Sequence, residues 1–137
     1  MDDADVDAAI TRTLGRRHWA VVGCSPDPWR DSHDVAAFLL ARGYHVVPVN
    51  PAVDEVLGQR CYPDLASIPA ATPVEVVDIF RRSSEAGAHV DEAIAIGARA
   101  VWMQLGVIDR GAAARARAAG LDVVMNRCPK IELPRRG

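Results

Sequence analysis

A short stretch that follows an apolar run carries the residue types that bind phosphate. The run WAVV is followed by GCSPDPWRDS, residues 23–32. Glycine lets the backbone turn tightly and approach a ligand, hydroxyl and free helix N–H groups donate to anions, and arginine supplies a fork of donors. The residues of these types are Gly23, Ser25, Arg30 and Ser32. They predict a phosphate site, although a plain strand-to-helix turn with a solvated arginine explains the same pattern.

The cysteines are the other candidates for chemistry. Cys24, Cys61 and Cys128 form no C-x-x-C pair and no zinc spacing, so the sequence predicts free thiols and no metal site. Cys128 lies between Arg127 and Lys130, and neighbouring cations favour a reactive thiolate. An inert, half-buried thiol is the alternative for Cys128. No Ser-His-Asp order and no pair of carboxylates suggests another catalytic centre.

The elements that must position these residues alternate between strands and helices. Apolar runs typical of buried parallel strands lie at 19–22, 44–49, 74–79, 100–103 and 121–125. Helix-period segments lie at 3–14, from Ser32 as the N-cap to Gly43, at 83–97 and at 109–119. The proline-containing segment 51–73 is expected to be irregular apart from one helical turn near Leu65.

This alternation predicts the fold class. We expect an α/β, three-layer, Rossmann-like doubly wound domain with a five-stranded parallel sheet in the order 3-2-1-4-5. The chain of 137 residues is expected to form one domain. Residues 1–17 would be an N-terminal helical extension and 127–137 a polar C-terminal tail.

Ligands of such sheets bind outside the carboxyl ends of the strands. The residues that follow the strands should therefore surround one cleft. They are Gly23, Cys24 and Ser25; Asn50 and Pro51; Phe80, Arg81 and Arg82; Gln104, Leu105 and Gly106; and Asn126, Arg127 and Cys128.

The end of the second strand bears on which nucleotide fits. A site for NAD usually has a carboxylate there for the ribose hydroxyls, and a G-x-G-x-x-G turn. Here the strand ends in PVNP, with Asn50 between two prolines, and the turn at Gly23 lacks the remaining glycines. The NAD(P) interpretation is therefore weakened, and an adenine edge held against a stiff backbone is favoured.

Five ordered stretches resemble the stand-alone CoA-binding proteins, whose domain is similar to the N-terminal CoA-binding domain of the succinyl-CoA synthetase alpha subunit. The stretches are AVVGCSPDPWRDSHDVAAFLLARGYHVVPVNP, VLGQRCYPDLASIP, VEVVDIFRR, ARAVWMQLGV and GLDVVMNRCPKIE. Together they cover almost all of the chain from Trp19 to Glu132.

The resemblance implies a place for each candidate residue along CoA. The phosphates would lie by Gly23, Ser25, Arg30 and Ser32, with Cys24 inside the same loop, and the adenosine by Val49, Asn50 and Pro51. Phe80 and Arg81 would lie over the cleft, Gln104 and Gly106 by the pantetheine, and Asn126 and Cys128 at the far rim.

Three functions are compatible with these residues. The favoured one is binding of CoA or an acyl-CoA without catalysis. The alternatives are an enzyme, either NAD(P)-binding or acting on thiols or acyl-CoA through Cys128, and an interaction protein with a vestigial cleft. A net charge of -2 gives no basic field for nucleic acid, and no apolar stretch is long enough for a membrane span. The acidic N-terminus favours the cytoplasm, and we expect a monomer or a weak homodimer.

Overall fold

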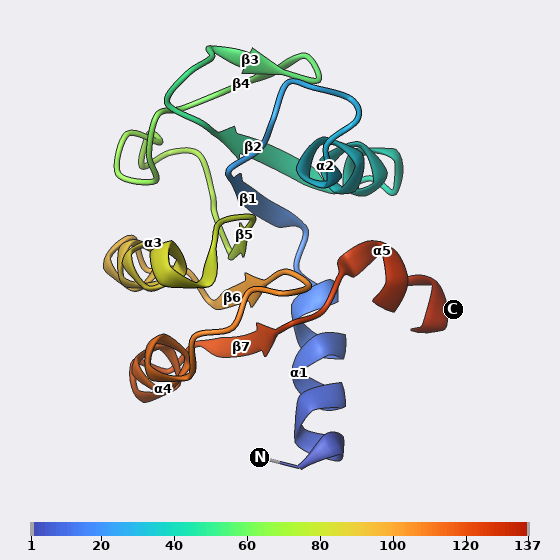
Figure 1. The fold of residues 1–137 in the computed structure, drawn as a ribbon, viewed down its shortest axis with the longest axis vertical. Coiled ribbons are helices and arrows are strands. Elements are labelled where there is room, and N and C mark those ends of the chain that lie inside the picture. Colours follow the sequence, from blue (N-terminus) through green and yellow to red (C-terminus); the bar gives the residue numbers. More distant parts are fainter. Residues whose placement is uncertain (1, 137) are drawn as a thin grey trace.

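A five-stranded parallel sheet forms the centre of the protein (Figure 1). The computed structural model describes residues 2–136. The strands are β1 (His18–Val22), β2 (His45–Val49), β5 (Val76–Ile79), β6 (Ala100–Met103) and β7 (Asp122–Met125). Every residue of β5 and β6 is buried, which explains why β6 is an unbroken apolar run and why β5 is apolar except for Asp78.

Helices cover both faces of the sheet, so the predicted three-layer α/β fold is confirmed. The helices α1 (Asp3–Leu14), α2 (Asp31–Ala41) and α5 (Pro129–Glu132) lie on one face, and α3 (Ser83–Ala95) and α4 (Arg110–Ala118) lie on the other (Figure 1). We call these the α2 face and the α3 face. None of the described helices has the length and apolar character of a membrane span.

The strand order is β2-β1-β5-β6-β7, and here the detailed prediction needs correction. The order 3-2-1-4-5 would place the third predicted strand, at 74–79, beyond the second. Instead β5 pairs with β1 on one side and with β6 on the other. In the numbering of the five predicted strands, the observed order is therefore 2-1-3-4-5.

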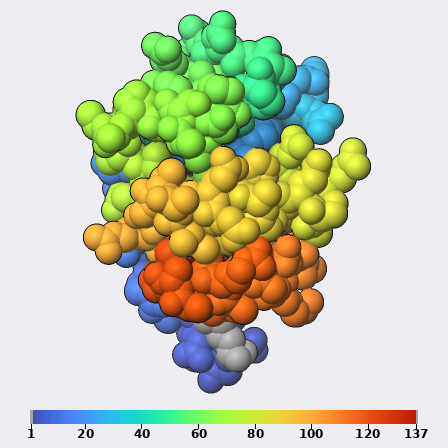
Figure 2. Space-filling model, turned by 90° about the vertical axis from the view of Figure 1, so that its left-hand side faces the viewer, coloured from blue at the N-terminus to red at the C-terminus, as the bar shows by residue number. Residues whose placement is uncertain are grey.

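The physical reason is the face that segment 51–73 covers. Leu65 is buried in the same core cluster as α3 and α4, and Figure 2 shows the green segment stacked above α3 on that face. The crossover through α2 runs over the opposite face. Because parallel crossovers are right-handed, connections on opposite faces move the chain in opposite directions across the sheet. The chain therefore returns past β1 to form β5.

Segment 51–73 also contains a small hairpin that the sequence did not reveal. Strands β3 (Glu55–Val56) and β4 (Gln59–Arg60) are antiparallel. Leu57 and Gly58 connect them with φ of 54° and 72°, the double positive φ of a two-residue hairpin turn. Leucine rarely adopts this conformation, so periodicity gave no signal for it.

Two other predicted boundaries differ from the structure. Helix α2 begins at Asp31 with Arg30 as its N-cap residue, so Ser32 lies in the first turn and is not the cap. The segment predicted as a polar tail forms α5 and a 3-10 turn, η1 (Pro134–Arg136). Helix α5 packs against α2 and thereby becomes part of the carboxyl edge of the sheet.

Candidate functional site

A groove of three adjoining pockets follows the carboxyl ends of the strands. The central pocket, of about 450 Å³, is lined by Gly23, Arg30, Asp31, Ser32, Phe80, Arg81, Arg82, Glu85, Gln104, Leu105 and Val107. The β2-side pocket, of about 350 Å³, is lined by Val22, Gly23, Ser25, Arg30, Val49, Asn50, Pro51, Pro63, Asp64, Arg81 and His89. The α2–α5 pocket, of about 250 Å³, is lined by Asp31, Asp34, Val35, Phe80, Gln104, Leu105, Cys128, Lys130 and Ile131. The central pocket shares lining residues with each of the other two, so the three pockets lie side by side along this edge.

Gly23 allows the ends of β1 and β5 to approach each other at the centre of the groove. Its φ is 80°, and a Cβ built on it would lie 2.4 Å from the carbonyl oxygen of Phe80. No side chain fits that space, and a positive φ adds strain for any other residue. The point between β1 and β5 is also where the chain reverses direction across the sheet, which is where α/β domains bind ligands.

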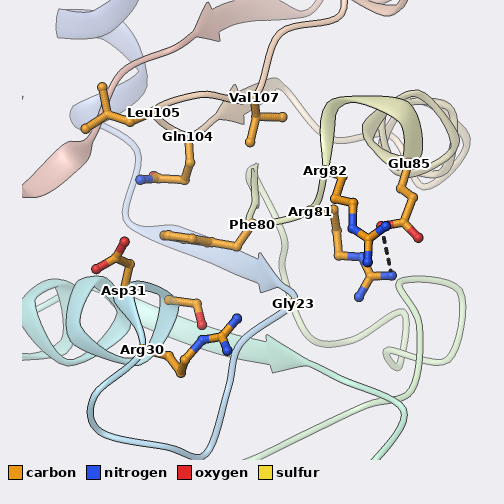
Figure 3. Close-up of a pocket in the computed structure, with 11 residues that line it drawn as sticks. Gly23, Arg30, Asp31, Phe80, Arg81, Arg82, Glu85, Gln104, Leu105 and Val107 are labelled. Carbon is orange, nitrogen blue, oxygen red and sulfur yellow. Dashed lines mark ion pairs between the residues drawn. The ribbon is translucent and has the colours of Figure 1, made fainter.

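The central pocket concentrates positive charge. Arg30, Arg81 and Arg82 line it and are exposed. Figure 3 shows Arg81 and Arg82 beside the start of α3 and Arg30 across the pocket, beside the start of α2. Arg81 forms an ion pair with Glu85 at 3.2 Å, so its charge is partly compensated. Arg30 has no such carboxylate partner among the described residues.

Two helix N-termini reinforce this charge. Residues 30–32 at the start of α2 and residues 82–85 at the start of α3 contribute to the same pocket. The first N–H groups of a helix have no carbonyl partner within it and carry partial positive charge. Ser32 shapes the loop between them, because its Oγ accepts a hydrogen bond from the N–H of Ser25 at 2.9 Å. The arrangement is suited to an anion with several oxygens.

Asn50 stabilises the wall of the β2-side pocket. Its Nδ2 donates to the carbonyl oxygen of Cys24 at 3.0 Å, and its Oδ1 accepts from the N–H of Ala52 at 2.9 Å. The amide therefore ties the end of β2 to the loop after β1. Asp64 supplies a carboxylate to this pocket, and two hydrogen bonds from Ser67 to it lower its pKa. Strand-end reasoning missed Asp64, because it lies in the irregular crossover.

The α2–α5 pocket differs in character from the centre. Val35, Leu105 and Ile131 give it apolar walls. An ion pair of 2.6 Å between Lys130 and Asp34 connects α5 to α2 beside it. Cys128 is nearly buried, with 8 % of its surface exposed, and contributes to the wall.

Four residues that were expected to surround the cleft lie outside the three pockets, and one of them, Arg127, donates from its guanidinium to the carbonyl oxygen of Asn126. Cys24 is fully buried beneath the loop, and burial raises the pKa of its thiol to about 12. Asn126 and Gly106 instead form a clasp between two loops, in which the N–H of Gly106 donates to Oδ1 of Asn126 at 2.8 Å. The other predicted residues all line the groove: Gly23, Ser25, Arg30, Ser32, Val49, Asn50, Pro51, Phe80, Arg81, Gln104 and Cys128.

Sequence reasoning missed residues that come from helices and from the crossover. Helix α2 contributes Asp34 and Val35, α5 contributes Lys130 and Ile131, and α3 contributes Glu85 and His89. The signal that could have found the α5 residues was Pro129, since proline is favoured in the first turn of a helix. Within the described residues, no cluster of three or more His, Cys, Asp or Glu side chains is arranged to hold a metal ion.

The fold and the groove together define a doubly wound α/β domain with an arginine-lined cleft at its switch point. The chain belongs to the CoA binding domain family, which it matches over residues 17–134. It is 35% identical over 125 residues to the uncharacterized protein YneT of Bacillus subtilis (strain 168), covering 90% of this chain and 91% of that protein.

Solved structures agree with this assignment. A hypothetical protein from Pyrococcus horikoshii OT3 superposes with a TM-score of 0.88 at 43% identity, covering 94% of this chain and 90% of that one. The apo form of a dinucleotide-forming acetyl-coenzyme A synthetase from Ca. Korarchaeum cryptofilum has a TM-score of 0.73 at 25% identity, covering 85% of this chain and 28% of that one. The predicted resemblance to stand-alone CoA-binding proteins and to the synthetase domain is therefore confirmed.

Proposed function

We propose that this protein binds CoA or an acyl-CoA in the groove and has no catalytic activity of its own. The observation that carries the proposal is the division of the groove into a centre lined by three arginines, an end with apolar walls and an end bordered by Val49, Asn50 and Pro51. CoA has the same division, with phosphates between an adenosine and a pantetheine arm. Membership of the CoA binding domain family supports the same ligand.

Charge favours one direction for the ligand. Phosphates fit the central pocket, because Arg30, Arg81 and Arg82 and two helix N-termini surround it. The α2–α5 pocket has two carboxylates, Asp31 and Asp34, against one lysine, so it disfavours an anion and suits the pantetheine end. The adenosine would then occupy the β2-side pocket, against Val49, Asn50 and Pro51.

We propose that residues 1–137 form one domain. Residues 1–17 are its helical extension, in which Arg12 of α1 pairs with Asp122 of β7 at 2.8 Å. Residues 127–137 supply α5, which forms a wall of the α2–α5 pocket. Three buried free cysteines fit a reducing compartment, so we place the protein in the cytoplasm. We expect a monomer or a weak homodimer, with no nucleic-acid or membrane partner.

A ligand panel tests the proposal. Calorimetry with CoA, dephospho-CoA, NAD and NADP should give measurable binding for CoA alone or for CoA most strongly. At about 100 times its dissociation constant, CoA would add roughly 2.7 kcal/mol to the free energy of unfolding. This is a rise in melting temperature on the order of 5–10 °C. NAD binding without CoA binding would overturn the proposal and give Asp64 the role of a ribose-binding carboxylate.

Cys128 supports a second candidate, a thiol exchange with the ligand. It lines the pocket assigned to the pantetheine end and lies near the ammonium group of Lys130. In the exchange, the Cys128 thiolate would attack CoA disulfide, forming a protein–CoA disulfide and releasing one CoA thiolate.

Intact mass after incubation with CoA disulfide tests this exchange. We expect one adduct that reductant removes and that Cys128→Ser abolishes. Cys24→Ser should retain the adduct, because Cys24 is sealed beneath the loop. An adduct that persists in Cys128→Ser would contradict the exchange.

A further inference from the structure

A carboxyl group lies buried beneath the floor of the groove. Asp78 is in β5, opposite Val21 of β1 and Trp102 of β6, and it is 0% exposed. No described lysine, arginine or histidine forms an ion pair with it. A buried charge without a partner is costly. Burial accordingly raises the pKa of Asp78 well above its ordinary value.

The neighbour of this carboxyl group is the amide of Gln104. One end of the amide lies 2.9 Å from Oδ1 and 3.3 Å from Oδ2 of Asp78. This distance requires a proton between the two groups. Either the carboxylic acid donates to Oε1 of Gln104, or the amide nitrogen donates to a carboxylate. Since no cation compensates Asp78, we treat it as a neutral acid. Its buried O–H then needs an acceptor, and Oε1 of Gln104 supplies one. In this first arrangement the amide nitrogen lies on the opposite side.

The free side of the amide faces the groove. Gln104 lines both the central pocket and the α2–α5 pocket, so it lies at their junction. Figure 3 shows the end of the Gln104 side chain pointing into the space between Leu105 and Asp31, and in the first arrangement the amide nitrogen occupies this end. Beyond the junction, the α2–α5 pocket has apolar side chains from Val35, Leu105 and Ile131. A donor followed by an apolar space is complementary to a carbonyl group that carries a short hydrocarbon chain.

We propose that Asp78, as a neutral acid, orients the Gln104 amide so that its N–H groups bind the thioester carbonyl of a short acyl-CoA, whose acyl chain lies in the α2–α5 pocket. The inference rests on the proposed function and specifies it: the ligand is acyl-CoA, and free CoA binds more weakly. Gln104 contacts the ligand. Asp78 is a positioning residue that acts through Gln104.

The expected preference follows from two contributions. A hydrogen bond between neutral groups contributes about 3–10-fold in affinity, and each buried methylene contributes about fourfold. Butyryl-CoA should therefore bind at least about tenfold more tightly than CoA. Acetyl-CoA should fall between them, because it offers the carbonyl but only a methyl group to the pocket.

Calorimetry on the full chain with CoA, acetyl-CoA and butyryl-CoA tests the inference. Gln104→Leu keeps a similar size and removes the donor, so it should weaken butyryl-CoA about 3–10-fold more than it weakens CoA. Gln59→Leu is the matched control, since Gln59 of β4 lies outside the three pockets and should change neither affinity.

Two substitutions at Asp78 test whether it orients the Gln104 amide or only stabilises the fold. Asp78→Asn can still donate to Oε1 of Gln104 and should preserve the preference for butyryl-CoA. Asp78→Val cannot donate and should reduce the preference toward that of Gln104→Leu. If Asp78→Val does not fold, loss of the preference in Asp78→Asn still overturns the role of Asp78.

The remaining outcomes distinguish failure of the acyl subsite from failure of CoA binding itself. Equal affinity of the wild-type protein for CoA and butyryl-CoA would overturn the acyl subsite and leave CoA binding intact. If Gln104→Leu lost the same affinity for CoA as for butyryl-CoA, the acyl subsite would also be overturned. Binding of neither ligand would overturn the inference and the proposed function together.

Discussion

The two faces of the sheet have different chemistry, although both are closely packed. Among the described residues, the buried polar side chains lie on the α2 face or on the helices that cover it. They are Thr13, Ser32, Asp78, Gln104 and Glu132. The buried cysteines belong to the same core cluster. The cluster on the α3 face consists of aliphatic residues and methionine, with five alanines from α3 and α4 at the helix contacts.

This difference indicates that the α3 face contributes mainly to stability and the α2 face to ligand binding. Small alanines bring α3 and α4 close to the sheet and leave no polar group that needs a partner, so this face provides stability. The α2 face retains groups that are costly to bury, and three of them, Ser32, Asp78 and Gln104, lie under or beside the groove. We therefore expect substitutions on the α3 face to change the free energy of unfolding and substitutions around the groove to change ligand affinity.

The largest expected effect is on the α3 face. Leu65, in the crossover, is 1% exposed, and Leu65→Ala should lower the free energy of unfolding by about 2–5 kcal/mol. Urea denaturation measures this change. Ile96→Ala is the control, because Ile96 is 37% exposed and should cost far less. The affinity of the folded variant for CoA should not change. A marked loss of affinity would contradict the division between the faces.

A substitution at Arg30 should change ligand affinity and leave stability almost unchanged. Arg30→Ala should weaken CoA binding by roughly 1.5–3 kcal/mol at low salt, the contribution of a charge-assisted hydrogen bond, with little change in stability. The effect should shrink at high salt because the group is exposed. Arg99→Ala is the matched control, because exposed Arg99 precedes the amino end of β6, at the opposite edge of the sheet. Unchanged affinity at low salt would make Arg30 an ordinary solvated charge.

Asp78 gives a smaller effect with a defined pH dependence. Because its pKa is raised in the folded state, the folded protein binds more protons than the unfolded chain. Its contribution to stability is therefore complete below the unfolded pKa of about 3.9 and is lost as pH rises through the raised folded pKa. Asp78→Asn removes this loss.

Thermal unfolding from acidic to neutral pH measures the difference between Asp78→Asn and the wild-type protein. Each unit of pKa difference corresponds to about 1.4 kcal/mol, or on the order of 4 °C in melting temperature for a chain of this length. The melting temperature of Asp78→Asn should exceed that of the wild-type protein most at neutral pH. The neighbouring Cys24 thiol stays neutral across this range, since its pKa is about 12. A difference that does not vary with pH would indicate that Asp78 is ionised in the folded state.

The sequence predicted the strands and the place of the loop after β1 in the groove, because both have local signals. Each strand is a short apolar run that ends in a turn, and Gly23 with Arg30 marks the loop directly. The strand order was wrong because it depends on which face segment 51–73 covers, and that segment has neither a helical nor a strand period. Leu65 is the residue that decides the face, but a single leucine among prolines carries no such information in sequence.

The site was predicted less completely for a related reason. Strand ends can be counted along the chain, so Asn50, Phe80 and Gln104 were found. Whether a residue after a strand points into the groove depends on local conformation. Asn126 has a φ of 60° and uses its side chain to hold Gly106. The residues contributed by α5 depend on a tertiary contact with α2, which no local pattern encodes.

The position of β1 in the sheet also determines how the chain can fold during synthesis. Strand β1 precedes both of its partners in sequence, and its second partner, β5, ends only at Ile79. Until that residue has left the ribosome, one edge of a strand composed almost entirely of buried residues has unpaired backbone groups. The nascent chain therefore passes through a stage that is prone to aggregation and open to chaperones. The groove is complete only when α5 has followed, so a ligand of the groove would stabilise the finished domain but could not template its first half.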